Sequence, residues 1–354
     1  MKVAVYSISK NEEQFVVRWA ESAKDADMIL LADTGSTDNT IQLAKDLGVT
    51  VVEIEVKPWR FDVARNKSLD AIPQDYDYCI ALDLDEVLVP GWRKHLELMH
   101  ELGVTRPRYK YTWSWNEDGS EGLVYGGDKI HARKFYTWKH PVHEVIKPTN
   151  KKETALWCDI EIHHHPDNSK PRSQYLPLLK LSVEEDPHDD RNAHYYAREL
   201  LIYGHNEEAK KEFIRHLNLP TARWKPERSC SMRYIARCCE DYNEKIEWLF
   251  KAIAECPESR EAWVELARLY YSVEDWHGCY FAAKKAADIT DKPMQYINES
   301  WAWNGYIYDL GSIAAHYLQQ DEQAFEWCKK ALEFAPDEER LINNLKQFEE
   351  ALNG

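Results

Sequence analysis

The sequence predicts two domains of different class, an α/β domain over residues 1–170 and an all-α domain of helical repeats over residues 171–354. Two observations predict this division. Short apolar strands alternate with helices in the first quarter of the chain, which is typical of a parallel sheet covered on both faces. From Tyr175 onward the strand patterns stop, and amphipathic helices rich in Ala, Leu, Trp and Tyr follow. A length of 354 residues suits two domains.

The α/β pattern begins with an apolar strand at residues 3–9. The turn that follows it, Lys10-Asn11-Glu12-Glu13, begins a helix that reaches about Lys24. A loop dense in turn formers and helix caps, Asp33 to Thr40, follows the second strand and begins the second helix. The remaining expected elements are strands at 28–32, 49–56 and 78–82, and helices up to residue 47 and at 61–71.

Ligands of parallel sheets bind at the carboxyl ends of the strands. Six polar residues are expected to gather at that edge: Ser7, Ser9, Asp33, Arg65, Asp83 and Asp85. The first strand is not followed by Gly-x-Gly-x-x-Gly, and the chain has no Gly-x-x-x-x-Gly-Lys-Ser/Thr motif. The sequence therefore predicts that carboxylates, a metal and an arginine, rather than a glycine loop, hold a nucleotide.

The run Ile80-Ala81-Leu82-Asp83-Leu84-Asp85-Glu86 ends an apolar strand with three carboxylates. Residues two apart on an extended chain point the same way, so Asp83 and Asp85 can converge on one cation. Hard ions such as Mg²⁺ and Mn²⁺ prefer oxygen ligands of this kind. The alternative is a helix cap or a solvated turn.

Four motifs in order resemble family 2 glycosyltransferases of the GT-A fold. They are Ser-x-x-Lys-Asn-Glu-Glu, Asp33-Thr-Gly-Ser-Thr-Asp-Asn-Thr, Trp59-Arg-Phe-Asp-x-Ala-Arg65-Asn and Asp83-Leu-Asp85-Glu. The nearest branch is the one fused to tetratricopeptide repeats. The resemblance covers the first half of the chain, and an ordered set is more specific than any single motif.

The resemblance implies a nucleoside-diphosphate-sugar donor, with uridine as the default base. Ser7, Ser9 and the Asp33-Thr34 pair would contact the base, Arg65 the base or the pyrophosphate, and Asp83 the ribose. Asp85 would bind the Mn²⁺ or Mg²⁺ that bridges the diphosphate and stabilises its developing charge. The alternatives are an Asx-turn cap for Asp33 and a surface helix arginine for Arg65.

The middle of the chain predicts a hairpin at residues 108–115 with a turn at 116–119, and another strand at 129–136. By resemblance, Glu144 in the His143-Glu144 pair is the base of an inverting transfer, which takes the acceptor proton opposite the leaving diphosphate. The alternative is a salt-bridged acid at a strand edge. Asp118 is the second choice of base, although its Asp-Gly setting suits a turn.

Three consecutive histidines, His163 to His165, end a strand pattern. In the resembling transferases a histidine late in the domain often joins the metal shell. Because alternate strand residues share a face, Ile160 and Ile162 predict that His164 faces the site. His163 or His165 would replace it if the register slips, and a solvent-facing cluster is the alternative. Without Cys-x-x-Cys or His-Glu-x-x-His, zinc is not favoured.

Prolines recur in the second half at steps near 34 residues, the period of helix-pair repeats that stack into a solenoid. Segments such as Glu261 to Tyr271 and Glu322 to Pro336 resemble tetratricopeptide helices. The repeats could position the acceptor, bring two protomers together as a homodimer, or both.

The formal net charge of −16 argues against a general nucleic-acid-binding surface. Eight cysteines without framework spacing suggest reduced thiols in the cytoplasm. No signal peptide or transmembrane run is visible, so no membrane insertion is expected.

We therefore expect a metal-dependent, inverting glycosyltransferase that acts on a nucleotide sugar, with a glycan, a peptide or a modified base as acceptor. The rival is a non-catalytic protein-interaction scaffold that uses the helical repeats. A scaffold has no need of Asp83, Asp85 and Arg65 together, which favours the enzyme.

Overall fold

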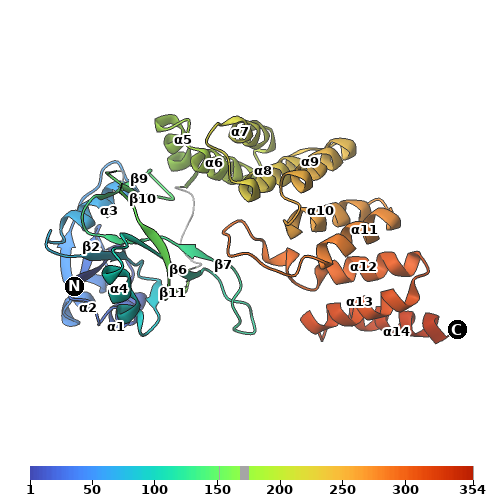
Figure 1. The fold of residues 1–354 in the computed structure, drawn as a ribbon, viewed down its shortest axis with the longest axis horizontal. Helices are drawn as coiled ribbons and strands as arrows, with labels where there is room; N and C mark the ends of the chain where they lie inside the picture. Colours follow the sequence, from blue (N-terminus) through green and yellow to red (C-terminus); the bar gives the residue numbers. More distant parts are fainter. Residues whose placement is uncertain (151, 168–174, 354) are drawn as a thin grey trace. The chain divides into compact units, whose positions relative to one another are not determined.

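The computed structural model describes residues 1–150, 152–167 and 175–353 (Figure 1). The chain divides into two compact units, the first built mainly from Met1–Ser182 and the second from Val183–Pro293 and Ile297–Gly354. The expected domain boundary at residue 170 lies outside the described residues. It therefore stays a prediction.

The centre of the first unit is a five-stranded sheet in the order β3-β2-β1-β4-β8. Its strands are β1 (Val3–Ser9), β2 (Met28–Asp33), β3 (Thr50–Glu53), β4 (Tyr78–Ala81) and β8 (Ile130–Ala132). The first four pair in parallel, as the alternating pattern predicts, and β8 pairs antiparallel with β4. Their carboxyl ends therefore lie along one edge.

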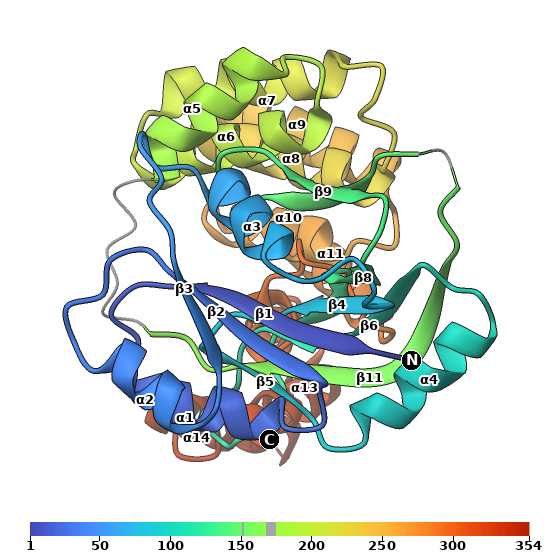
Figure 2. The same ribbon diagram turned by 90° about the vertical axis from the view of Figure 1, so that its left-hand side faces the viewer.

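Helices cover both faces of this sheet (Figure 2). On one face, helices α1 (Glu13–Ser22) and α2 (Thr40–Asp46) pack against Val3 and Val5. On the other, helix α3 (Phe61–Asp70) packs against Ala4 and Tyr6. The alternation of side chains along β1 supplies one apolar row to each core, which explains why this strand is buried on both faces.

A second sheet adjoins the acidic run, in the order β5-β11-β6-β7. Its strands are β5 (Glu86–Leu88), β6 (Arg106–Thr112), β7 (Val124–Gly127) and β11 (Ala155–His164), with helix α4 (Trp92–Glu101) following β5. The predicted hairpin is confirmed, because β6 and β7 pair antiparallel. Gly127 is required there, since an added Cβ would lie 2.1 Å from the ring of Tyr109.

The single strand predicted at residues 129–136 is wrong. The segment forms two short strands in different sheets, β8 and β9 (Tyr136–Lys139), and β9 pairs with β10 (Val145–Pro148). The chain changes direction between them at Phe135, which has a φ of 70° and a side chain that is 61 % exposed. A residue with left-handed backbone conformation interrupts strand pairing. The alternation of apolar residues in the sequence does not reveal such a conformation.

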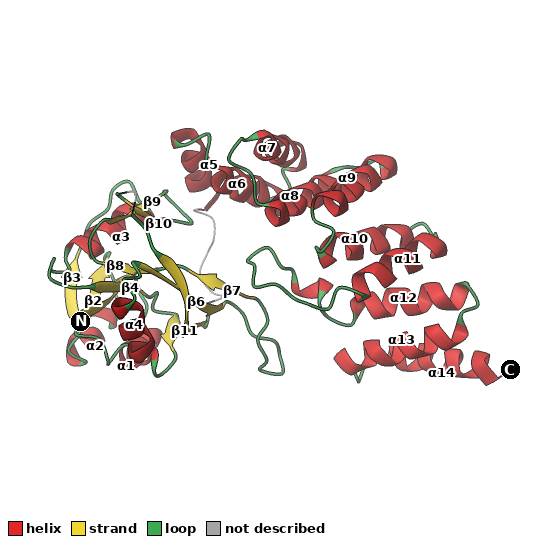
Figure 3. Cartoon of the chain, viewed as in Figure 1, coloured by secondary structure: helices red, strands yellow, loops and turns green. Residues whose placement is uncertain are grey.

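The rest of the described chain is helical, apart from loops (Figure 3). The helices are α5 (Tyr175–Glu185), α6 (Asp190–Ile202), α7 (Asn206–Asn218), α8 (Lys225–Cys238), α9 (Tyr242–Glu255), α10 (Arg260–Tyr271), α11 (Trp276–Ala287), α12 (Tyr306–Tyr317), α13 (Asp321–Phe334) and α14 (Glu339–Asn353), with a short 3₁₀ turn at Ser300–Ala302.

The helices of the second unit form a series of pairs. From α6 to α13, each helix of a pair packs against its chain neighbour, and α6, α8, α10 and α12 also contact one another in sequence. Small residues allow neighbouring helices to pack closely. At Gly311 of α12, for example, an added Cβ would collide with the ring of Trp327 on α13. The predicted helical-repeat class is confirmed. No helix in the described ranges is long and apolar enough to cross a membrane.

Candidate active site

Three of the expected base-contacting residues, Ser9, Asp33 and Thr34, meet in one hydrogen-bonded corner at the ends of β1 and β2. Ser9 Oγ donates to Asp33 Oδ1 at 3.0 Å, and Thr34 Oγ1 donates to the carbonyl of Ser9 at 2.8 Å. Ser7 is fully buried, and its Oγ donates to the carbonyl of Ile8 at 3.2 Å. The parallel pairing of β1 with β2 places these residues together.

Asp33 caps the loop that it begins. Its Oδ2 accepts the backbone N–H groups of Gly35 and Ser36, each at 2.8 Å, and the side chain is almost entirely buried. This is the Asx-turn geometry that was the alternative for Asp33. The carboxylate gives the loop a fixed shape, and its contact with a base stays a proposal.

Arg65 on α3 joins two carboxylates that are distant in the sequence. Its Nη2 donates to Asp83 Oδ1 at 2.7 Å, and its Nε donates to Glu144 Oε1 at 2.6 Å. The guanidinium lies 5.1 Å from the ring centre of Trp138 and its side chain is only 5 % exposed. Burial by itself would lower the pKa of Arg65. The charges of Asp83 and Glu144 outweigh this effect, and the pKa lies above its usual value. The surface-arginine alternative for Arg65 is therefore wrong.

Asp83 has a second cationic partner that sequence reasoning missed. Lys129, just before β8, donates from Nζ to Asp83 Oδ2 at 2.8 Å and to Glu86 Oε1 at 3.2 Å. Burial would raise the pKa of Asp83, but Arg65 and Lys129 lower it more strongly. Asp83 is thus a fixed carboxylate. The sequence offers little reason to select Lys129, because a lysine directly before an apolar strand is common on protein surfaces.

Asp85 and His164 lie side by side at one end of the second sheet. Asp85 directly precedes β5, and His164 is the last residue of β11, which pairs with β5. The Nδ1 of His164 lies 2.9 Å from the carbonyl of Trp113, and its Nε2 lies 3.4 Å from Asp85 Oδ2. A carbonyl only accepts hydrogen bonds, so Nδ1 carries the proton and the lone pair of Nε2 in the neutral ring points at Asp85. The prediction that His164 shares the inward face of the strand with Ile160 and Ile162 is confirmed, because all three residues are buried.

This pair has the geometry of two ligands of one cation. Neighbouring ligands of an octahedral ion lie roughly 3 Å apart, close to the Nε2–Oδ2 separation. The Nδ1–H bond to a carbonyl is the outer hydrogen bond that metal-binding histidines usually make. Burial lowers the pKa of His164, but Asp85, the carbonyl of Trp113 and Glu86 together raise it above its usual value. The residues therefore fit a divalent cation.

The other two histidines of the run lie elsewhere. His163 Nε2 lies 3.5 Å from Glu161 Oε2, on the face of β11 where Lys110 bridges Glu161 and Glu121. His165 donates its backbone N–H to the carbonyl of Asp85 at 2.8 Å. The histidine side chain nearest to Asp85 is therefore that of His164, and its role as a ligand remains a prediction.

Glu144 and Asp118, the two candidate bases, differ in environment. The carboxylate of Glu144 is 9 % exposed and is held by Arg65. Asp118 lies in an exposed turn and accepts from Ser120 N at 2.9 Å and from Ser120 Oγ, which lowers its pKa. Asp118 caps that turn, which favours its structural interpretation. Glu144 lies with the donor-site residues, since it shares Arg65 with Asp83.

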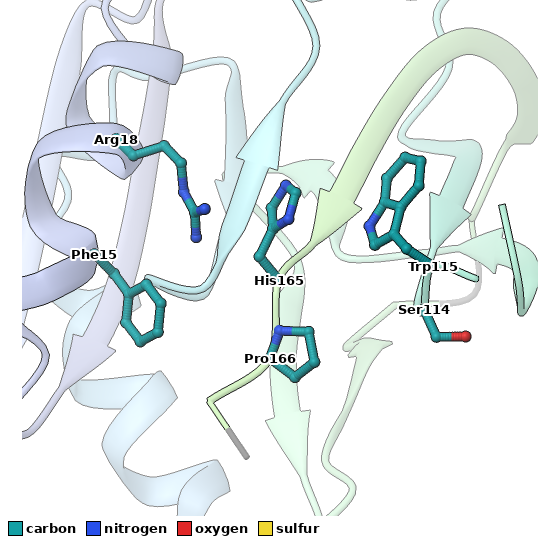
Figure 4. Close-up of a pocket in the computed structure, with 6 residues that line it drawn as sticks. All are labelled: Phe15, Arg18, Ser114, Trp115, His165 and Pro166. Carbon is teal, nitrogen blue, oxygen red and sulfur yellow. The ribbon is translucent and has the colours of Figure 1, made fainter. Parts of the chain in front are cut away.

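A hollow of about 460 Å³ lies in the first unit where β11 ends, with His165, the residue after His164, in its wall. It is lined by Phe15, Arg18, Ser114, Trp115, His165 and Pro166 (Figure 4). Trp115 on its wall donates from Nε1 to the carbonyl of His164 at 3.1 Å. The hollow thus offers aromatic and apolar surface and one guanidinium, and Trp115 connects its wall to the backbone of His164.

His164→Ala is expected to weaken Mn²⁺ binding by at least about tenfold, whereas His163→Ala should leave it unchanged, because only His164 points its lone pair at Asp85. Isothermal titration calorimetry with MnCl₂ measures both variants. The pair is matched, since the two residues are adjacent on one strand. Equal losses in the two variants would contradict the assignment of His164.

Arg65→Met is expected to lower the free energy of unfolding by about 3–5 kcal/mol, because it leaves two largely buried carboxylates without their shared partner. Chemical denaturation measures this. Arg93→Met is the control: Arg93 also pairs with two acids, Asp27 and Glu97, which are much more exposed, and its loss should cost about 1 kcal/mol or less. A loss of only about 1 kcal/mol or less in Arg65→Met would show that the Asp83–Arg65–Glu144 contact stabilises the fold no more than an exposed ion pair does.

Comparison with known families explains this collection of residues. Residues 5–152 match the model of the family described as Glycosyl transferase family 2. This segment is therefore similar to the family 2 glycosyltransferases. The match spans β1 to β10 and includes every candidate site residue except His164.

Curated relatives are similar to this chain over one short stretch. An uncharacterized glycosyltransferase of Rickettsia typhi is 34% identical over 97 residues, which are 27% of this chain and 32% of that protein. One from Rickettsia bellii is 35% identical over 97 residues, with the same coverage of 27% and 32%. The chain thus spans about a third of the length of the curated relatives that it matches.

Solved structures similar to this chain are helical-repeat proteins of low sequence identity. MamA is 16% identical with a TM-score of 0.37, covering 47% of this chain and 89% of its own. A thermophilic TPR protein of Thermus thermophilus is 18% identical with a TM-score of 0.33, covering 51% of this chain and 89% of its own.

Proposed function

We propose that this protein is a metal-dependent, inverting glycosyltransferase that moves a sugar from a nucleotide-sugar donor, with UDP-sugars as the first choice, to an acceptor nucleophile. The observation that carries the proposal is the convergence of Asp85 and His164 beside the Asp83–Arg65 ion pair. The similarity to family 2 glycosyltransferases supports the reaction class.

The donor would lie along the carboxyl edge of the first sheet. Ser7, Ser9, Asp33 and Thr34 would contact the base, and Asp83 the ribose. Arg65 would contact the base or the pyrophosphate side. Since the guanidinium is shared between Asp83 and Glu144, donor binding would exchange part of that contact for a contact to the donor.

Asp85 and His164 would hold Mn²⁺ or Mg²⁺. Such an ion, when bound, offsets the charge that develops on the leaving diphosphate. The protein supplies one carboxylate oxygen and one imidazole nitrogen, and a donor diphosphate would fill further positions.

Glu144 would act as the base. It would accept the proton of the acceptor as the nucleophile attacks the anomeric carbon opposite the leaving diphosphate. The hollow beside Trp115 and Arg18 is the place we propose for the acceptor. Its aromatic surface suits stacking with a ring, while the choice among a glycan, a peptide and a modified base remains open to experiment.

The helical unit would position the acceptor or join two protomers, since every donor and metal residue proposed lies before Asp167. We place the protein in the cytoplasm, a proposal supported by eight cysteines that are all free thiols.

Screening nucleotide sugars by thermal shift, with Mn²⁺, with Mg²⁺ and with EDTA, tests the proposal. A nucleotide sugar should raise the melting temperature only when the divalent cation is present, and slow donor hydrolysis should accompany it. Absence of cation-dependent stabilisation across UDP-, GDP-, CMP- and dTDP-sugars would overturn the proposal and favour the scaffold.

A further inference from the structure

Lys129 occupies the space between two carboxylates of the candidate site. It enters from the first residue before β8, where the backbone of Ala81 donates its N–H to the carbonyl of Lys129 at 3.2 Å. The Nζ lies 2.8 Å from Asp83 and 3.2 Å from Glu86, and the side chain is only 25 % exposed. The antiparallel pairing of β8 with β4 thus fixes a cation at the end of the acidic run.

Glu86 is buried beside Asp85 and accepts hydrogen bonds from three groups. Burial raises its pKa, whereas Lys129 lowers it, and the donors are Tyr111 Oη at 2.6 Å, the backbone N–H of Asp83 at 2.9 Å and Lys129 Nζ. Two of these partners, the backbone N–H and the lysine ammonium, can only donate, which favours the ionised carboxylate. Lys129 is therefore the ionic partner of a buried acid next to Asp85.

The charges of the site are unequal. Four carboxylates, those of Asp83, Asp85, Glu86 and Glu144, are connected by ion pairs to two permanent cations, Arg65 and Lys129, and to His164. Two negative charges are therefore left over when His164 is neutral. One divalent cation offsets them, but an anionic diphosphate must then enter a site that still contains four carboxylates.

We propose that Lys129 is a positioning residue of the donor site, whose fixed charge on Asp83 and Glu86 lets an anionic diphosphate bind together with the metal. The proposal rests on the function proposed above and adds a residue to it. Without Lys129, the same carboxylates would attract a metal ion more strongly and repel the donor. Lys129 thus makes the site bind metal and donor jointly rather than metal alone.

This role predicts effects of opposite sign in one variant. In Lys129→Met, Mn²⁺ alone should bind about tenfold more tightly, because one positive charge close to the ion is removed. The donor, or UDP with Mn²⁺ at saturation, should bind at least about tenfold more weakly for the same reason. A residue that only stabilises the fold would weaken both bindings, or neither.

The experiment is calorimetry on the full chain at pH 8, with MnCl₂ alone and then with UDP in saturating MnCl₂. Lys129→Arg keeps the charge and should restore both affinities to within about threefold of wild type. The double variant Glu86→Gln/Lys129→Met removes one charge of each sign, so its affinity for Mn²⁺ alone should return close to the wild-type value.

Arg93→Met is the matched control. Arg93 also joins two carboxylates, Asp27 and Glu97, within the same domain, and neither belongs to the candidate site. It should change neither affinity. If Lys129→Met is too unstable to purify, Lys129→Gln carries the test, because it removes the charge but keeps a hydrogen-bond donor and should show the same opposite shifts in the two affinities.

Parallel losses of Mn²⁺ and UDP affinity in Lys129→Met, or unchanged affinities for both, would overturn the role of Lys129. Failure of the wild-type protein to bind UDP with Mn²⁺ would instead overturn the function proposed above, and the two failures are therefore distinguishable.

Discussion

Asp85→Ala is expected to abolish Mn²⁺-dependent donor binding, with a loss of at least about 10²-fold in affinity, while the protein stays folded. The substitution removes the carboxylate that faces Nε2 of His164 at 3.4 Å, and a single imidazole holds a hard cation poorly. The fold should survive because the Asp85 side chain is 20 % exposed and its backbone carbonyl, which accepts from His165, is kept.

Calorimetry with Mn²⁺ and UDP measures the loss, and the melting temperature without ligand checks the fold. Asp159→Ala is the control, since Asp159 is an exposed acid on β11 and should affect neither quantity. Unchanged Mn²⁺-dependent affinity in Asp85→Ala would remove Asp85 from the metal site and with it the main support for a metal-dependent transfer.

Glu144→Gln is expected to lower the rate of donor hydrolysis by about 10²–10⁴-fold, because it keeps the size of the side chain but removes its basicity. Water replaces the acceptor in this assay, so no acceptor needs to be known. If Glu144 acts as the base, donor affinity should change little. If Glu144 only orients Arg65, which it contacts at 2.6 Å, donor affinity should fall together with the rate.

Glu153→Gln is the control for Glu144→Gln, because Glu153 is also a glutamate paired with an arginine, Arg106 at 3.3 Å, in the same unit. Its hydrolysis rate should equal that of the wild type. A Glu144→Gln rate within a few-fold of wild type would exclude Glu144 as the base, and Asp118 would then be tested next.

Local sequence patterns were sufficient to predict the order of strands and helices in residues 1–82 and the edge at which the polar residues gather. The end of each buried strand is marked by a change from apolar to polar residues, as at Leu82-Asp83, and parallel strands bring their carboxyl ends together. The same local period predicted that His164, rather than His163, faces inward. These features depend on side-chain direction along one strand, which a few neighbouring residues determine.

The sequence by itself therefore determined the two fold classes, the parallel core of the first sheet and the inward face of His164. Only the tertiary structure decided the ion pairs: Arg65 with Glu144, 79 residues away, and Lys129 with Asp83, 46 residues away. It also decided that residues 129–136 divide between two sheets, which is what brings Lys129 to the acidic run. Such pairings depend on how β8 joins β4 and how α3 packs over β1. The packing of the whole domain sets these arrangements, and no short segment encodes them.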